Sequence, residues 1–428
     1  MSQATFLDRK EIQKVQLKHL NQVLSECLNS ESFYTLRLRE DGINGPVNSI
    51  AEFQEKSRAT TKQELIDDQN RFPPYGRKLT LPVGEYTRFS QTSGITGYPL
   101  RWPDTSEGWE WMLASWRVVL RNSGVSQADR IMFTFSFGPF IGFWLAFEAA
   151  QSLGCMCFPG GGLNSSARLA MMFDNRVNVL CCTPTYALHL AEIAAKEGLD
   201  IKSLASKKLI VAGEPGASIP ATRQKIEDAW GKGCVADHHG MTEVGPVSYE
   251  CPSRAGVLHI IESAYLPEVV DTETLQAVSP GIEGELVLTV LGRIGCPVLR
   301  YRTGDRVKAA SDPKCACGRD DLALEGGILG RTDDMLVVCG VNIHPSAIED
   351  VVRSQENIVE YRVEVNRRNT LPQISIQIEI GQDGGADKTC ELLARKLQEM
   401  FLLRIAVTAV RQGQLPRFEM KAQRWVMN

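Results

Sequence analysis

Apolar residues recur at helical spacing at the start of the chain. Within residues 9–28 they stand at Ile12, Val15, Leu17, Leu20, Val23 and Leu24. Residues three or four apart lie on one face of an α-helix, so this spacing predicts an amphipathic helix that covers a core. Shorter patterns up to residue 65 predict further short helices separated by turns, and we assign this whole region to the scaffold.

In the middle of the chain, runs rich in branched and aromatic residues alternate with helical stretches. We expect strands that begin near residues 130, 154, 177 and 208, the first of them running to residue 137. The alternation predicts parallel βαβ units. Ligands of such sheets bind outside the carboxyl ends of the strands, which is where Gly213, Glu214 and Pro215 fall.

Length and charge narrow the class of protein. A chain of 428 residues, 43% of them hydrophobic, is long enough for more than one domain and a sizeable core. A net charge of -4 gives no sign of a nucleic-acid or anionic-membrane partner, so small substrates fit better. The first ten residues are too charged for a secretory signal. We therefore expect a cytoplasmic protein whose twelve cysteines are reduced.

The segment 89–99 has the composition of a phosphate cradle. Its hydroxyl and glycine residues are Thr92, Ser93, Gly94, Thr96 and Gly97. Glycine lets the backbone approach an anion, and backbone N–H groups and hydroxyls can donate hydrogen bonds to phosphate oxygens. The segment is not a Walker loop, because it lacks both the spacing and the lysine. A turn without any ligand is the alternative.

Two later stretches carry residue types suited to a nucleotide. In residues 237–245, the Thr242 hydroxyl can bind a phosphate oxygen and Glu243 can hold Mg²⁺, a cation that takes carboxylates together with substrate phosphates. Asp305 follows a glycine turn and can accept hydrogen bonds from ribose hydroxyls. A polar loop with a helix cap at Thr242 is the alternative for the first stretch.

These stretches resemble motifs of the adenylate-forming ligase superfamily, and within it the phenylacetate-CoA ligase-like branch of aryl-CoA ligases. Five motifs stand in the right order, at residues 92–97, 212–215, 239–243, 300–305 and 330–335. The resemblance implies an α/β protein. Its large N-terminal domain, residues 1–332, would hold mostly parallel sheets with helices and a β-barrel-like portion. Residues 333–428 would form a small mobile α+β C-terminal domain.

The resemblance also implies a two-step reaction. A carboxylate attacks the α-phosphate of ATP, which gives an acyl-adenylate and pyrophosphate, and a thiol then displaces AMP. The residues implied for the nucleotide are Ser93, Gly94, Thr96 and Gly97 at the outer phosphates, Glu214, Pro215 and His239 at the adenine, Asp237 beside them, Thr242 and Glu243 at phosphate and Mg²⁺, Asp305 at the ribose, and Arg331 at the phosphates. Asp333 would be the hinge for the C-terminal domain.

The end of the chain resembles the family's terminal segment, in which a lysine bridges the acid substrate and the α-phosphate. Lys421 falls on that position and would be catalytic together with Thr242 and Glu243. A point cation on a flexible stem can neutralise charge that develops as the carboxylate attacks, and can be withdrawn when the domain rotates. A solvated surface lysine is the alternative.

The chain departs from the family pattern at three positions. Tyr98 stands where the family commonly has lysine, His239 where it has tyrosine, and Met420 where it has glycine. These departures point to weaker ATP binding without removing the central chemistry. They also leave open a catalytically inactive homologue that acts as a binding protein.

The acid site is expected to be apolar. Phe135 and Phe140 match pocket positions of the resembled aryl ligases, and the remaining expected lining residues are Ala212, Gly240, Met241 and Pro246. Such a wall favours a small aromatic acid of the phenylacetate, benzoate or anthranilate type. Rings that merely fill a core are the alternative. We expect coenzyme A as the acceptor, with residues 338–342 along the pantetheine tunnel. A carrier protein, and an amine in an amide-forming ligase, stay open.

Cysteine and histidine suggest a metal site. Cys315 and Cys317 form a tight pair, and Cys251 and His259 upstream would complete the Cys3His set of a tetrahedral structural Zn²⁺. Some members of the resembled branch have a similar arrangement. Free thiols in a turn are the alternative, because C-x-C is less diagnostic than paired C-x-x-C motifs. The sequence leaves open whether the chain forms a homodimer.

Overall fold

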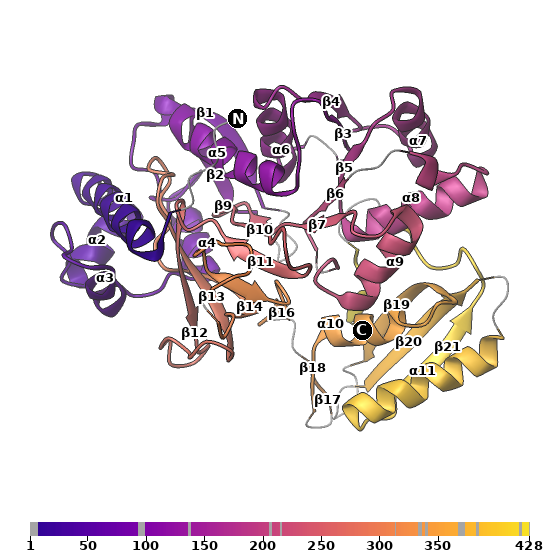
Figure 1. Cartoon of the computed structure of the whole chain (residues 1–428). Coiled ribbons are helices and arrows are strands. Elements are labelled where there is room, and N and C mark those ends of the chain that lie inside the picture. Colours follow the sequence, from indigo (N-terminus) through magenta and orange to yellow (C-terminus); the bar gives the residue numbers. More distant parts are fainter. Residues whose placement is uncertain are drawn as a thin grey trace.

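We describe the chain from a computed structural model. It covers residues 7–92, 99–135, 138–204, 208–214, 216–312, 314–332, 336–338, 341–366, 373–381, 385–418 and 422–427. The described elements form a large N-terminal part and a smaller C-terminal part that packs below α8 and α9 in Figure 1. Among the described residues, no helix has both the length and the apolar character needed to cross a bilayer.

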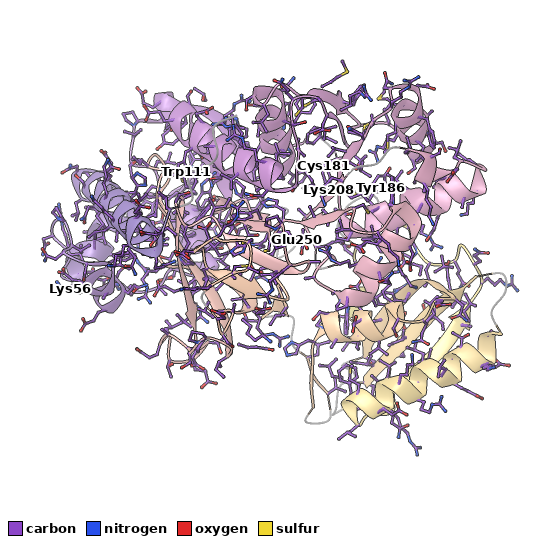
Figure 2. The ribbon with its side chains drawn as sticks, in the orientation of Figure 1. Lys56, Trp111, Cys181, Tyr186, Lys208 and Glu250 are labelled. Atoms are coloured by element: carbon purple, nitrogen blue, oxygen red, sulfur yellow. The ribbon has the colours of Figure 1, made fainter. Side chains whose placement is uncertain are left out.

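The N-terminal helices cover one side of the large part. They are α1 (Arg9–Asn29), α2 (Phe33–Glu40), α3 (Ile50–Lys56) and α4 (Lys62–Arg71). The buried face of α1 includes Leu20, Val23 and Leu24, which pack with Leu266 and Leu291. This confirms the predicted amphipathic helix. The opposite faces carry charged side chains such as that of Lys56, which is 43% exposed (Figure 2).

A five-stranded parallel sheet forms the centre of the large part. Its strands, in spatial order, are β4 (Met156–Pro159), β3 (Arg130–Phe133), β5 (Val179–Cys182), β6 (Lys208–Val211) and β7 (Val235–Asp237). The helices around it are α5 (Ser106–Asn122), α6 (Ile141–Ser152), α7 (Ser165–Asp174), α8 (Pro184–Lys196) and α9 (Pro220–Trp230). The predicted βαβ alternation is confirmed. Figure 2 shows Cys181 and Tyr186 in the interior beside this sheet, where both are buried.

One strand is shorter than predicted. The sequence predicts a strand to residue 137, whereas β3 ends at Phe133. The backbone N–H and the hydroxyl of Thr134 both donate to the carbonyl of Cys181, at 3.2 and 3.1 Å, at the end of the neighbouring strand. β3 ends just before Thr134, and Phe135 follows at the carboxyl edge of the sheet.

Antiparallel sheets complete the large part. One has the order β12 (Tyr265–Val270), β13 (Glu283–Val290), β14 (Tyr301–Lys308), β16 (Gly330–Arg331), and another β10 (Ser248–Glu250), β11 (Val257–Ile260), β15 (Ala323–Glu325). Two hairpins join β1 (Tyr86–Gln91) to β2 (Arg101–Thr105) and β8 (Gly240–Met241) to β9 (Gly245–Pro246). Short 3₁₀ helices lie at Val83–Glu85 and Ile201–Ser203. Parallel and antiparallel sheets together give the predicted α/β class.

The C-terminal part has its own hydrophobic cluster, which includes Ile343, Ile348, Val363 and Leu397. Its elements are β17 (Leu336–Val338), β18 (Val341–Ile343), α10 (Pro345–Arg353), β19 (Ile358–Asn366), β20 (Gln373–Ile380), α11 (Ala386–Phe401), β21 (Ala406–Val410) and β22 (Trp425–Met427), with the sheet order β21-β20-β19-β22. This is the predicted α+β composition. The expected hinge residue Asp333 lies outside the described residues, so the domain boundary stays a prediction.

Candidate active site

Residues predicted to bind a nucleotide meet where β14 and β16 approach the end of β7. The Nε2 atom of His239 lies 2.9 Å from Oδ2 of Asp305, and Nη1 of Arg331 lies 3.3 Å from Oδ1 of Asp305. Burial alone would raise the pKa of Asp305, but the charges and hydrogen bonds of His239 and Arg331 outweigh it and hold that pKa below its usual value. The carboxylate is therefore kept as an acceptor, the form that ribose hydroxyls require.

The turn at Gly304 allows this approach. Gly304 has a φ of +74°, a region that side chains rarely adopt. A Cβ atom at this position would lie 2.6 Å from the Arg331 guanidinium. The glycine of the R-T-G-D stretch thus lets Arg331 pack closely against the strand that carries Asp305.

Asp237 and the neighbouring His238 are both buried at the end of β7. The backbone N–H of Asp237, at the end of β7, donates to Glu250 (2.6 Å), and the Asp237 carboxylate accepts from the backbone N–H of His238 (2.9 Å). Burial and the Glu250 charge raise the pKa of Asp237 to about 7. Burial lowers the pKa of His238 to about 4, and its ring packs against Trp116 at 4.3 Å between centroids. Asp237 therefore helps to hold in place the loop that follows β7.

The Thr242–Glu243 backbone is held by a buried arginine that the motifs did not point to. Nη1 of Arg293 donates to the carbonyls of Thr242 (2.8 Å) and Glu243 (3.1 Å). The same guanidinium makes a two-fold contact with Asp104 at 2.5 and 2.6 Å, and both side chains are almost fully buried. Asp104 lies in β2 and Arg293 in a distant loop, so no local pattern connects them.

The Glu243 carboxylate already faces a cation. Its Oε1 atom lies 3.2 Å from Nζ of Lys62 and accepts from the Tyr301 hydroxyl at 3.3 Å. Glu243 is only 4% exposed. A buried carboxylate that takes an ammonium on its open side fits the Mg²⁺ role that the sequence suggested. Lys62, at the first position of α4, was not expected here.

Residues predicted to line the acid site gather at the β8–β9 hairpin. Gly240 pairs with Pro246, and a Cβ at Gly240 would lie 2.8 Å from the carbonyl of Gly245. Met241 is half-buried beside them, and α6, which begins after Phe140, packs against this hairpin. Two further expected lining residues stand at the ends of neighbouring strands of the parallel sheet: Phe135, which is buried, after β3, and Ala212, which is half-buried, after β6.

Several expected residues lie outside the described part of the chain. They are Ser93, Gly94, Thr96 and Gly97 of the cradle, Pro215, and Lys421, which was expected to be catalytic. The flanks of the cradle are described. The backbone N–H of Thr92 donates to the carbonyl of Leu100 at 3.0 Å, and the Thr92 hydroxyl oxygen accepts from the backbone N–H of Leu100, also at 3.0 Å. The cradle segment is therefore closed at its base by the β1–β2 hairpin.

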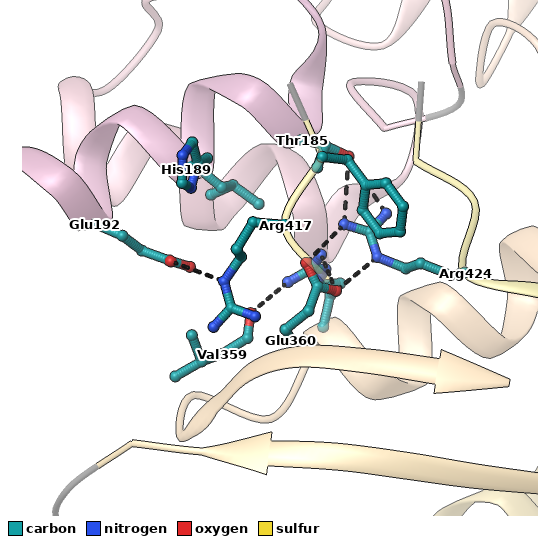
Figure 3. Close-up of a pocket in the computed structure, with 10 residues that line it drawn as sticks. Thr185, His189, Glu192, Val359, Glu360, Arg417 and Arg424 are labelled. Carbon is teal, nitrogen blue, oxygen red and sulfur yellow. Dashed lines mark hydrogen bonds and ion pairs between the residues drawn. The ribbon is translucent and has the colours of Figure 1, made fainter. Parts of the chain in front are cut away.

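The segment that follows Lys421 is attached to the end of β6. One carboxylate oxygen of Glu214 accepts from the backbone N–H of Ala422 and the other from that of Thr185, both at 2.8 Å. Arg424 is buried, donates to Glu360 at 2.7 Å and lies 3.3 Å from the Thr185 hydroxyl. Figure 3 shows Thr185, Glu360 and Arg424 in the small pocket between α8 and β19. The chain at 422–424 is thereby held beside the candidate nucleotide loops.

The four predicted metal ligands also come together. The Sγ atoms of Cys251, Cys315 and Cys317 and a ring nitrogen of His259 all lie within 4.8 Å of one another. Sγ of Cys251 is 3.5 Å from Sγ of Cys315, and Sγ of Cys317 is 3.4 Å from Nε2 of His259. Tetrahedral zinc would separate such pairs by about 3.8 and about 3.6 Å, given the usual bond lengths. Nδ1 of His259 contacts the carbonyl of Asp321 at 3.0 Å, which leaves Nε2 for a metal.

Comparison with known proteins identifies the family. A model of the AMP-binding enzyme family matches residues 89–290, and one of the AMP-binding enzyme C-terminal domain matches residues 340–427. The chain is 29% identical to a phenylacetate-coenzyme A ligase of Thermus thermophilus (96% of this chain, 95% of the relative) and 28% identical to that of Escherichia coli (97% and 94%).

Solved structures add the arrangement of the two parts. A 2-hydroxyisobutyryl-CoA ligase in its postadenylation state superposes with a TM-score of 0.92 at 26% identity, over 99% of this chain and 91% of that one. The same ligase in its thioesterification state gives only 0.73, with the same identity and coverage. The two parts of this chain are thus arranged as in the former state. The chain belongs to the adenylate-forming superfamily of AMP-binding enzymes, and within it to the phenylacetate-CoA ligase-like proteins.

Proposed function

We propose that this protein activates a small aromatic carboxylate with ATP and transfers the acyl group to coenzyme A. The observation that carries the proposal is the convergence of His239, Thr242–Glu243, Asp305 and Arg331, from three distant stretches, at the carboxyl end of the parallel sheet. Relatives along the whole chain that are named as phenylacetate-CoA ligases support the substrate class.

In the first step, a carboxylate oxygen of the acid forms a bond to the α-phosphorus of ATP, and the bond to the β-phosphate oxygen breaks. Pyrophosphate leaves with the electron pair. Asp305 accepts hydrogen bonds from the ribose, while His239 and the chain at Glu214–Pro215 flank the adenine. Arg331 and the cradle residues Ser93, Gly94, Thr96 and Gly97 contact the phosphates, and Asp237 supports the loop. Positioning and charge neutralisation of this kind are what phosphoryl transfer requires.

Charge at the reacting atoms is stabilised by Thr242, Glu243 and Lys421. The Thr242 hydroxyl donates to a phosphate oxygen, and Glu243 holds Mg²⁺, which neutralises phosphate charge when bound. Lys421 neutralises the attacking carboxylate and the α-phosphate. In the second step the thiol sulfur attacks the acyl carbon, the bond to the AMP oxygen breaks, and AMP leaves. Rotation of the C-terminal part at Asp333 withdraws Lys421 between the steps.

The apolar wall formed by Phe135, Phe140, Ala212, Gly240, Met241 and Pro246 favours an aromatic acid over a charged or long-chain one. Pyrophosphate release and product mass should be measured with phenylacetate, benzoate, anthranilate and 2-hydroxyisobutyrate, each with coenzyme A, a carrier protein or an amino acid as acceptor. We expect pyrophosphate, AMP and an aryl-CoA thioester. An amide product would favour an amide-forming ligase, and no release with any acid would favour an inactive homologue.

We further propose that Cys251, His259, Cys315 and Cys317 hold a structural Zn²⁺ that fixes the loop before β15 to the β10–β11 hairpin. Purified protein is expected to contain one zinc per chain, and Cys315→Ser to lose it and to unfold at a temperature several degrees lower, because three ligands remain. Cys390→Ser, at a half-buried cysteine of α11, is the matched control and should keep the metal. Metal-free wild type, with Cys315→Ser unchanged in stability, would contradict the proposal.

A further inference from the structure

Lys62 is placed at the active site by backbone contacts that leave little freedom to its Cα atom. The backbone N–H of the preceding Thr60 donates to the carbonyl of Arg300 (2.8 Å), and its carbonyl accepts from Arg302 (2.9 Å). The Thr60 hydroxyl donates to the carbonyl of Leu299 at 2.8 Å. Thr61 then caps α4 in a capping box with Glu64. The first residue of the helix is thus fixed against the start of β14.

The side chain of Lys62, in contrast, is partly exposed to solvent. It is 43% exposed, whereas the side chain of its partner Glu243 is 5% exposed. The ammonium therefore stands between a buried carboxylate and solvent. A long, flexible stem lets such an ammonium move several ångströms without disturbing the helix.

Other basic groups near this loop have their own partners. Arg293 is 1% exposed and donates to Asp104 and to the Thr242 and Glu243 carbonyls. Arg331, which we also assign to the phosphates, shares its charge with Asp305. The cradle segment 89–99 contains no lysine, and its residue 98 is a tyrosine. A triphosphate bound here needs positive charge that neither the cradle nor Arg293 provides.

We propose that Lys62 binds the outer phosphates of the nucleotide, an inference that rests on the proposed function. Without nucleotide the ammonium is the counterion of Glu243. With MgATP bound, Glu243 would hold the metal, and the Lys62 ammonium would donate to β- or γ-phosphate oxygens. Glu243 exchanges one cation for another and is never left as an uncompensated buried charge, which would be costly.

The test compares Lys62→Met with Lys62→Arg and with Lys56→Met. Lys56 is the matched control, because its side chain is also 43% exposed and also pairs with a glutamate, Glu52, at 2.7 Å. MgATP binding should be measured by calorimetry, and pyrophosphate release and thioester formation from pre-made acyl-adenylate by rate. Thermal unfolding checks that each variant is folded, and Lys62→Gln replaces any variant that is not.

Lys62→Met is expected to weaken MgATP binding and the rate of pyrophosphate release at limiting ATP by about 10- to 100-fold, as for loss of a charged hydrogen bond. Lys62→Arg should keep most of both, and Lys56→Met should match wild type. Thioester formation from the adenylate should be unaffected, because the outer phosphates have left.

Two results would overturn the inference. If Lys62→Met binds MgATP as wild type does, Lys62 makes no phosphate contact. If Lys62→Met lowers the Mg²⁺ concentration needed for pyrophosphate release but leaves ATP binding unchanged, Lys62 is only the counterion of Glu243. A failure of the proposed function looks different, because wild type would then release no pyrophosphate with any acid, while the binding comparison would still give an answer.

Discussion

Replacement of Lys421 by alanine is expected to slow acyl-adenylate formation by about 100- to 1,000-fold, the usual cost of removing one group that stabilises charge in a transition state. The segment directly after it is bound to Glu214 and Thr185 beside the nucleotide loops. We therefore propose that Lys421, directly before this segment, contacts the carboxylate and the α-phosphate together. Pyrophosphate release in a rapid-quench assay with the preferred acid measures the effect.

The same variant should form thioester from pre-made acyl-adenylate and coenzyme A at nearly the wild-type rate, because the second step has no pyrophosphate to release. Lys388→Ala, at an exposed lysine in the first turn of α11, serves as the control and should leave both steps unchanged. Equal loss in the two half-reactions would mean that Lys421 acts on folding or on domain docking instead of on the adenylation chemistry.

Arg293→Met is expected to lower the free energy of unfolding of the N-terminal part by about 3–5 kcal/mol, because it leaves the buried Asp104 carboxylate without its partner. It also frees the Thr242 and Glu243 carbonyls, so adenylate formation should fall as well. Arg293→Lys should rescue little, since a single ammonium cannot reproduce the planar contact with Asp104 and the carbonyls. Urea unfolding and pyrophosphate release measure the two effects.

A double variant and a surface control separate the cost of a buried charge from the loss of support for the loop. In Arg293→Met combined with Asp104→Asn, no charge stays buried, so part of the stability should return while the loop stays unsupported. Arg117→Met removes a surface partner of Glu110 and should change stability by less than about 1 kcal/mol. Arg293→Met with wild-type stability and activity would show that the buried pair neither holds the fold nor positions the loop.

Local patterns predicted much of the fold and the site because they depend on neighbours in the chain. The helical spacing of α1 and the βαβ alternation are both confirmed. The contact of His239 and Arg331 with Asp305 joins residues from three motifs. The four metal-site side chains meet as expected, although metal binding itself stays a prediction.

Long-range contacts could not be predicted, because they have no local signature. Nothing in the sequence around Arg293 or Asp104 connects the two, since they stand in a loop and an edge strand 189 residues apart. Lys62 opens a scaffold helix, and its relation to Glu243 arises from the docking of Thr60 on β14. The aromatic and branched residues led to a prediction that the first central strand is longer than it is, because β3 ends at Phe133.

The contact between the two parts includes charged and polar groups, which suits the mobile C-terminal domain that we propose. Lys225 of α9 donates to the carbonyls of Gln355 (2.8 Å) and Ile358 (3.0 Å), and Arg417 lies 3.4 Å from Glu192. Water can replace such hydrogen bonds when the parts separate, so each contributes only about 1–3 kcal/mol net. The better superposition on a postadenylation state than on a thioesterification state fits an interface with two arrangements.

The most direct test of the proposed reaction follows the oxygen atoms of the acid's carboxylate into the products. The preferred acid, labelled with ¹⁸O in its carboxylate, should be turned over with ATP, Mg²⁺ and coenzyme A, and the AMP and pyrophosphate analysed by mass spectrometry. An acyl-adenylate intermediate predicts that each AMP carries one heavy oxygen and that pyrophosphate carries none. Unlabelled AMP, or release of ADP with labelled phosphate, would contradict it.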